Sequence, residues 1–235
     1  MSARPALWLL PGLLCDAHVW HEQKAALAPD RDIHVADFYG FSSITAMARA
    51  VIDQAAGDFA LAGHSMGGRV AMEVARLAPE RVTRLMLLDT GHKPRQAGEE
   101  EKRMALVNLA RREGMRALAA VWLPPMVHPD RVKDGSLMEP LTEMVCRASP
   151  EIFAGQQRAL LDRPDASSGL GAIRCPVAIA CGRNDAWSPL AQHREIQALI
   201  PGSSLIVIED SGHMTTVERP AAVIAAMRSW LALAG

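Results

Sequence analysis

The sequence has few of the features that mark a nucleic-acid-binding or membrane-spanning protein. Its 235 residues include 25 basic and 26 acidic side chains, for a formal net charge of -1. This balance gives no electrostatic basis for binding nucleic acid or an anionic membrane. No apolar run approaches the ~18 to 20 residues that a membrane span needs. We therefore expect a small-molecule substrate as the partner, and the oligomeric state stays open.

Cysteine is also scarce, and the four cysteines have no C-x-x-C or zinc-like spacing: they are Cys15, Cys146, Cys175 and Cys181. A chain of this length does not need disulfides to fold, so we expect a reducing compartment, the cytoplasm. The apolar N-terminal stretch superficially resembles a signal peptide. Because Pro11-Gly12 interrupts it, we interpret this stretch as a buried strand.

Short apolar runs alternate with longer amphipathic stretches, which favours βαβ units in a mostly parallel sheet with helices on both faces. The expected strands are Ala6 to Leu10, Ile33 to Ala36, Phe59 to Ala62, Arg84 to Leu88, Val177 to Ala180 and Leu205 to Ile208. The clearest helices are Gly67 to Leu77, Leu190 to Ile200 and Pro220 to Ala234. This pattern predicts the α/β class.

The pattern changes between Pro94 and Ser168, where helical segments broken by glycine and proline show no strand signal. We expect a helical cap, residues 94–168, inserted after the strand that ends near Leu88. The α/β core would then comprise residues 1–93 and 169–235. In open α/β sheets ligands bind beyond the carboxyl ends of the strands, so we expect the cap to lie over that edge.

The segment with the clearest chemistry is Gly63-His64-Ser65-Met66-Gly67, followed by Gly68. It is a G-x-S-x-G motif between an expected strand and an expected helix, which is the context of a nucleophile elbow. Such a turn strains the serine backbone and requires glycines where a Cβ would collide with neighbouring elements. We predict that Ser65 is a nucleophile.

A serine hydroxyl needs a general base, and that base needs an orienting carboxylate. His213 follows the last expected strand directly and is the candidate base. Asp185, in the turn after the penultimate strand, is the candidate acid, and the order Ser65, Asp185, His213 fits this fold. The rival acid is Asp89, at the end of the strand after the elbow.

Acyl transfer also needs hydrogen-bond donors for the oxyanion, and fixed backbone N–H groups serve best. Met66 N–H is one candidate by position. The second should come from the loop after the first strand, where Gly12 would let the backbone turn and Pro11 has no N–H. Leu13 is the expected donor, and Leu14 is the alternative.

Together these segments resemble the α/β-hydrolase superfamily, close to small capped carboxylesterases and C–C bond hydrolases. The resemblance runs essentially from end to end: Leu9 to Gly12 is similar to the family's oxyanion loop, Gly63 to Gly68 to its elbow, Gly182 to Pro189 to its acid turn, and Ser211 to Pro220 to its ending. Many relatives have His-Gly where this chain has Pro11-Gly12. Ser65 excludes the aspartate nucleophile of related dehalogenases and epoxide hydrolases.

The resemblance implies a serine hydrolase that cleaves a carboxylic ester of a small, largely apolar substrate through an acyl-enzyme, without metal or organic cofactor. A C–C bond hydrolase or a lactonase would use the same three residues, and an inert ligand-binding member of the fold is a remote alternative. Residues of the insertion that could line an apolar pocket are Met104, Trp122, Leu123, Met126 and Phe153. They could equally form the core of the cap itself.

Overall fold

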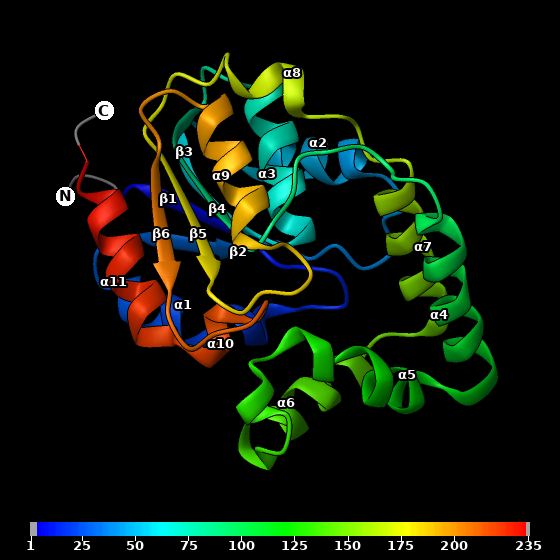
Figure 1. The fold of residues 1–235 in the computed structure, drawn as a ribbon. Helices are drawn as coiled ribbons and strands as arrows, with labels where there is room; N and C mark the ends of the chain where they lie inside the picture. Colours follow the sequence, from blue (N-terminus) through cyan, green and yellow to red (C-terminus); the bar gives the residue numbers. More distant parts are fainter. Residues whose placement is uncertain (1–3, 234–235) are drawn as a thin grey trace.

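The computed structural model describes residues 4–233, so the expected helix end at Ala234 lies outside the described residues. Within them, six strands form one sheet in the order β2-β1-β3-β4-β5-β6, and every neighbouring pair is parallel (Figure 1). The strands are β1 Ala6–Leu10, β2 Asp32–Val35, β3 Phe59–His64, β4 Val82–Leu88, β5 Val177–Gly182 and β6 Ser204–Ile208. All six expected strands are present: β1 has the expected bounds, and no end of the other five is shifted by more than two residues.

Helices cover both faces of the sheet. α3 packs on β1, β3 and β4 with α2 beside it, and α9 packs on β5 and β6, whereas α11 packs on β4 and β6 with α1 against it. The α-helices are α1 His21–Leu27, α2 Ile44–Gln54, α3 Met66–Leu77, α4 Glu99–Glu113, α5 Met115–Trp122, α6 Gly135–Cys146, α7 Pro150–Leu161, α8 Ser167–Leu170, α9 Leu190–Leu199, α10 Thr215–Glu218 and α11 Pro220–Leu231. Short 3-10 helices are η1 Ala17–Trp20, η2 Pro124–Met126 and η3 Pro129–Arg131. The predicted α/β class is confirmed.

The central strands are buried on both faces. Every residue of β3 is buried, as are the last four residues of β1 and of β4, which explains why these strands read as continuous apolar runs in the sequence. The chain passes from β1 to β2 on one side and returns past β1 to β3 on the other. The loops after β1 and β3 therefore lead to opposite sides of the sheet. In open α/β sheets, ligands bind at the point where the strand order reverses in this way.

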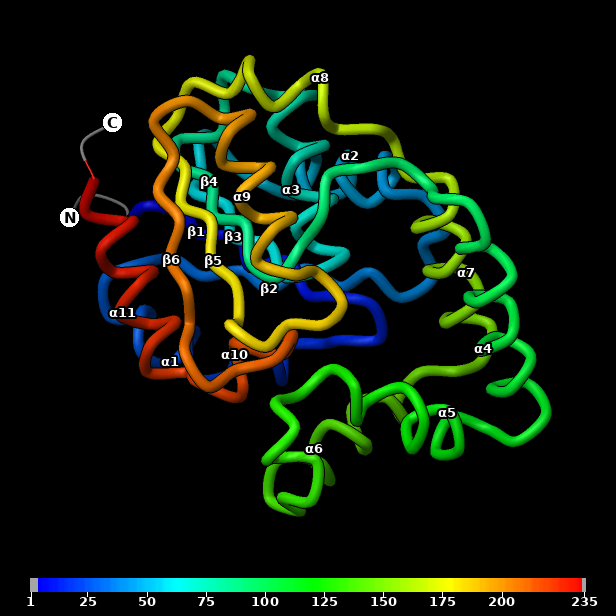
Figure 2. Tube along the Cα trace, viewed as in Figure 1, coloured from blue at the N-terminus to red at the C-terminus, as the bar shows by residue number. Residues whose placement is uncertain are grey.

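Between β4 and β5 the described chain contains helices and loops but no strand. Figure 2 shows α4 to α7 gathered beside the sheet, with α5 and α6 beyond the ends toward which the strand arrows of Figure 1 point. α4 contacts α5 and α7, and α5 contacts α6. The predicted cap boundaries fall just before α4 and inside α8. No described helix is long and apolar enough to cross a membrane.

The turn from β3 into α3 depends on close backbone approaches. A Cβ on Gly63 would lie 2.3 Å from the Gly67 carbonyl oxygen, and one on Gly67 would lie 2.1 Å from the Leu10 carbonyl oxygen. A Cβ on Gly68 would lie 2.6 Å from the Thr90 Cβ. These distances are far below van der Waals contact, so these three positions have no room for a side chain.

We predict that Gly67→Ala lowers the free energy of unfolding by about 3 kcal/mol or more, because the new methyl group must displace the backbone of β1. Urea unfolding followed by circular dichroism measures this. The matched control is Gly135→Ala at the start of α6, where a Cβ would meet nothing within 4 Å. The prediction is wrong if the two variants lose similar stability.

Candidate active site

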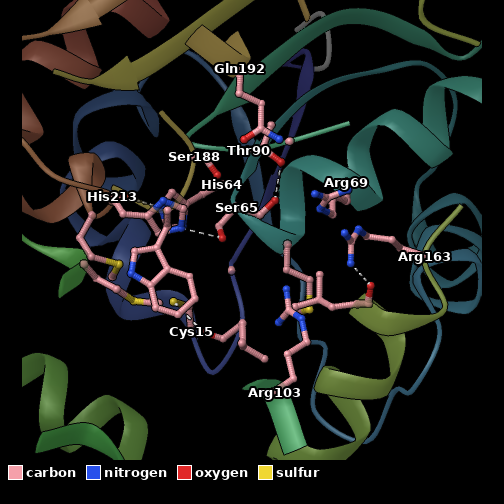
Figure 3. Close-up of a pocket in the computed structure, with 18 of the residues that line it drawn as sticks. Cys15, His64, Ser65, Arg69, Thr90, Arg103, Arg163, Ser188, Gln192 and His213 are labelled. Carbon is pink, nitrogen blue, oxygen red and sulfur yellow. Dashed lines mark hydrogen bonds between the residues drawn. The ribbon is translucent and has the colours of Figure 1, made fainter. Parts of the chain in front are cut away.

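Ser65 lies in the sharp turn between β3 and α3, with φ 55° and ψ -115°, a combination that strains a residue with a Cβ. Its N–H donates to the Leu88 carbonyl at 2.9 Å, which ties the turn to β4. Its side chain borders a cavity, and Figure 3 shows it facing His213. The hydroxyl is thus presented at the N-terminal end of α3, where the helix dipole favours negative charge.

His213 lies in the loop between β6 and α10. Its Nε2 is 2.8 Å from Ser65 Oγ, and its Nδ1 is 2.8 Å from Asp185 Oδ2. The loop is fixed by its own backbone: the His213 N–H donates to the Met126 carbonyl at 2.7 Å, and the His64 ring donates from Nε2 to the His213 carbonyl at 2.8 Å. The imidazole is therefore held in hydrogen-bond reach of both partners.

Asp185 lies in the turn after β5 and is almost completely buried. Its Oδ1 accepts the backbone N–H groups of Trp187 and Ser188, each at 2.8 Å. Burial acts to raise the pKa of this carboxyl, but the charge and hydrogen bond of His213 and the two N–H donors outweigh it and leave the pKa lowered. Asp185 is accordingly a carboxylate at neutral pH.

Asp89, the rival acid, lies in a different environment behind His213. It accepts hydrogen bonds from the Gly182 N–H at 2.9 Å and from the Thr215 hydroxyl, and its Oδ2 is 3.7 Å from His64 Nε2. Burial and the neighbouring charge of Asp185 raise its pKa well above the ordinary value. Within residues 4–233 it makes no hydrogen bond to the His213 ring, whereas Asp185 does.

The ring of His213 is buried, which by itself lowers its pKa. The charge of Asp185 and its hydrogen bond, together with the charges of Asp89 and Glu218, act in the opposite direction and leave the pKa raised overall. His64, beside the serine, forms no hydrogen bond to a carboxylate in the described chain, and burial and the charge of His213 lower its pKa to about 4. His64 is thus neutral and serves to brace the His213 loop.

The two expected oxyanion donors, Met66 and Leu13, both belong to residues that line the cavity beside Ser65. Met66 is the first residue of α3, and neither its N–H nor that of Leu13 donates to another group in the described part of the chain. The N–H of Leu14 is occupied, because it donates to Gln156 Oε1 at 2.8 Å. Of the two candidates that the sequence left open, Leu13 is therefore the one whose donor is free.

The loop after β1 turns differently from the expectation. We expected Gly12 to provide the turn, but the residue with a left-handed backbone is Leu14, at φ 58°. Gly12 instead allows a close approach, because a Cβ there would lie 3.1 Å from His64 Nδ1 and 3.2 Å from Ser65 Cβ.

The cavity next to Ser65 has a volume of about 270 Å³. Trp122 and Met126 line it, as expected, and so does Trp187 from the acid turn. Phe153 does not: it is completely buried, and its ring packs against that of Trp122 with centroids 6.4 Å apart. Met104 and Leu123 also lie outside the lining, so the apolar wall is made of other residues than expected. Those not expected there are Leu13, Cys15, Met66, Leu160, Trp187 and Met214.

The opposite wall of the cavity is polar, and its residues were missed in the sequence. They are Arg69, Glu99, Arg103, Arg163 and Gln192 (Figure 3 labels all but Glu99). The spacing of Arg69, four residues after Ser65 on the same helix, was a usable signal. Arg163 and Gln192 come from distant segments, and nothing in the local sequence places them here. The described residues include no group of three or more His, Cys, Asp or Glu side chains arranged to hold a metal ion.

Comparison with known proteins identifies the family of the chain. A model of the alpha/beta hydrolase family matches residues 9–226. A pimeloyl-[acyl-carrier protein] methyl ester esterase of Nitrosomonas europaea is 27% identical over 92% of this chain and 91% of its own length. A 3-oxoadipate enol-lactonase 2 of Acinetobacter baylyi is 28% identical over 93% of this chain and 85% of its own length.

Among solved structures, a thermophilic esterase from Thermogutta terrifontis superposes with a TM-score of 0.87 at 28% identity, covering 98% of this chain and 90% of the esterase. The resemblance inferred from the sequence motifs is thereby confirmed at the level of the family. The chain belongs to the alpha/beta hydrolase family, and it is an enzyme of the hydrolase class.

Proposed function

We propose that this hydrolase cleaves a carboxylic ester of a small molecule through a Ser65-His213-Asp185 triad and an acyl-enzyme. The observation that carries the proposal is the continuous line of hydrogen bonds from Ser65 Oγ through His213 to Asp185. It lies beside a cavity lined by Leu13 and Met66, whose N–H groups donate to no other group of residues 4–233. Each geometric requirement of acyl transfer has a candidate group here. The names of relatives, an esterase and an enol-lactonase, support the same bond class.

In the first step Ser65 Oγ attacks the substrate carbonyl while His213 Nε2 takes the hydroxyl proton. Asp185 accepts a hydrogen bond from His213 Nδ1–H, which holds the ring in the tautomer whose Nε2 can take a proton, and its charge stabilises the imidazolium that forms. The N–H groups of Met66 and Leu13 donate to the oxyanion, and one such donor contributes about 3 to 4 kcal/mol to lowering a barrier. His213 then protonates the leaving alcohol, and in the second step it activates water to release the acid.

A lactone is a second candidate substrate, because a cyclic ester undergoes the same attack and leaves both products joined. A relative 28% identical is named an enol-lactonase, which favours this option over C–C bond cleavage. None of the proposed steps uses a metal or an organic cofactor. A cytoplasmic location stays part of the proposal on the basis of cysteine content.

We predict that Ser65→Ala lowers kcat for short p-nitrophenyl esters by at least about 10⁴-fold, because no other group can form the acyl-enzyme. Spectrophotometric release of nitrophenol measures this, and a fluorophosphonate should label the wild type but not the variant. Ser229→Ala, on the exposed face of α11, is the control and should keep full activity. Equal rates for wild type and Ser65→Ala would contradict the proposal.

We predict different outcomes for the two aspartates. Asp185→Asn should lower kcat by about 10³- to 10⁴-fold, because the amide favours the wrong tautomer of His213. Asp89→Asn should lose less than about 10-fold, since the amide oxygen can still accept the Gly182 N–H and the amide nitrogen can donate to the Thr215 hydroxyl. Steady-state kinetics on one ester compares them. A larger loss in Asp89→Asn would transfer the role of triad acid to that residue.

The raised pKa of His213 also predicts a pH dependence. The general base must be neutral, so kcat/KM should fall as the pH drops through a pKa above the ordinary value of 6.5. In Asp185→Asn the stabilising charge is gone, and the inflection of the residual activity should move to lower pH. A pH profile of both proteins measures this. The same inflection in both would mean that Asp185 does not set the pKa.

A further inference from the structure

The polar wall of the cavity carries more positive than negative charge. Glu99 is its one acidic side chain among the residues that the structure places there, and two arginines share it. Arg163 bonds both oxygens of Glu99 at 2.7 Å, and Arg103 bonds Oε1 at 2.8 Å. Since these two guanidinium groups share a single carboxylate, the cluster keeps one net positive charge before Arg69 is counted.

Arg69 adds a further positive charge without a carboxylate partner. Its Nη1 donates to the Lys93 carbonyl at 2.9 Å, and no Asp or Glu of residues 4–233 forms an ion pair with it. Figure 3 shows its guanidinium across from that of Arg163. Arg69 is half-buried, and burial and the charges of Arg163 and Arg103 lower its pKa, so this cation lies among like charges without an acidic partner in the described chain.

A second donor lies beside Arg69. A Cβ on Gly91 would lie 2.1 Å from Gln192 Nε2 and 2.9 Å from Arg69 Nη2, so the amide and the guanidinium approach the same point over this glycine. The side chain of Gln192 makes no hydrogen bond within the described chain, although it lines the cavity. The amide of Gln192 and the guanidinium of Arg69 thus lie close together, and no carboxylate of residues 4–233 accepts a hydrogen bond from either of them.

We propose that Arg69 and Gln192 bind a carboxylate of the substrate, so that the substrate class is an ester carrying a carboxylate group. This rests on the proposed ester hydrolysis at Ser65. A planar guanidinium with an adjacent amide matches the two oxygens of a carboxylate and binds it through charge-assisted hydrogen bonds. Arg103 and Arg163 already donate to Glu99, so Arg69 and Gln192 are the donors left for the substrate. Two donor groups suffice for a single carboxylate.

The cavity limits the substrate to a small molecule. Ser65 and Arg69 both line it, and its volume is about 270 Å³. A short diacid monoester places an ester carbonyl and a carboxylate in one molecule of this size. Monomethyl glutarate has this form, and methyl pentanoate is its uncharged counterpart of equal chain length.

The test compares kcat/KM for two matched pairs in a pH-stat. Monomethyl glutarate and methyl pentanoate place the charge on the acyl side, whereas 4-acetoxybutanoate and butyl acetate place it on the alcohol side. The wild type should prefer the anionic member of one pair by about 10- to 100-fold, chiefly through KM. Arg69→Met should bring this ratio close to one, Arg69→Lys should restore part of it, and Gln192→Leu should lower it.

The control is Arg112→Met on α4, which removes the same charge from a side chain that is 72% exposed and does not line the cavity. It should keep the wild-type ratio. No preference in either pair, or a preference that persists in both Arg69→Met and Gln192→Leu, would overturn the subsite and leave the ester hydrolysis standing.

Failure of the proposed function is a separate outcome. If none of the four esters is hydrolysed, calorimetric titration with glutarate tests the subsite alone. Binding that Arg69→Met weakens by about 10-fold or more and Arg112→Met does not would support the carboxylate site. Absent binding, or equal binding by all three proteins, would overturn it.

Discussion

The site depends on one close backbone approach, that of α3 to the end of β1. Gly67 has no room for a side chain because the Leu10 carbonyl lies where its Cβ would be. This contact fixes the N-terminus of α3, which contributes the N–H of Met66, against the loop that contributes the N–H of Leu13. The strain at Ser65 follows from the same constraint, because the chain must reverse between β3 and α3 within one residue.

The insertion contributes to the position of the base as well as to the pocket. The Met126 carbonyl accepts the N–H groups of His213 and Met214, at 2.7 Å and 3.2 Å, so the histidine loop is hydrogen-bonded to the insertion. Glu218 continues this link: it accepts the N–H of Gly212 and of His128. A change in the packing of the insertion should therefore displace His213 as well as the pocket wall. Under the proposed mechanism, this would couple substrate recognition to catalysis.

The sequence predicted the elements whose signals are local. Buried parallel strands appear as apolar runs, and the elbow glycines around Ser65 have a spacing that few other structures require. The choice of Asp185 over Asp89 needed distances, because both follow strands that end at the same edge of the sheet. Phe153 was misplaced because a helix pattern does not tell which buried side chains face a cavity and which lie behind another ring.

The arginines of the cavity were missed for a related physical reason. Arg103 follows Glu99 by one helical turn, a pattern typical of a solvent-exposed ion pair, and only the fold brings Arg163 to the same carboxylate. The role of Arg69 follows from its helix. α3 carries Met66 at its first residue and Arg69 in its first turn, and both residues line the cavity. Under the two proposals above, one helix would supply a donor for the oxyanion and the guanidinium for the carboxylate. Substrate recognition and oxyanion stabilisation would then depend on the position of the same helix.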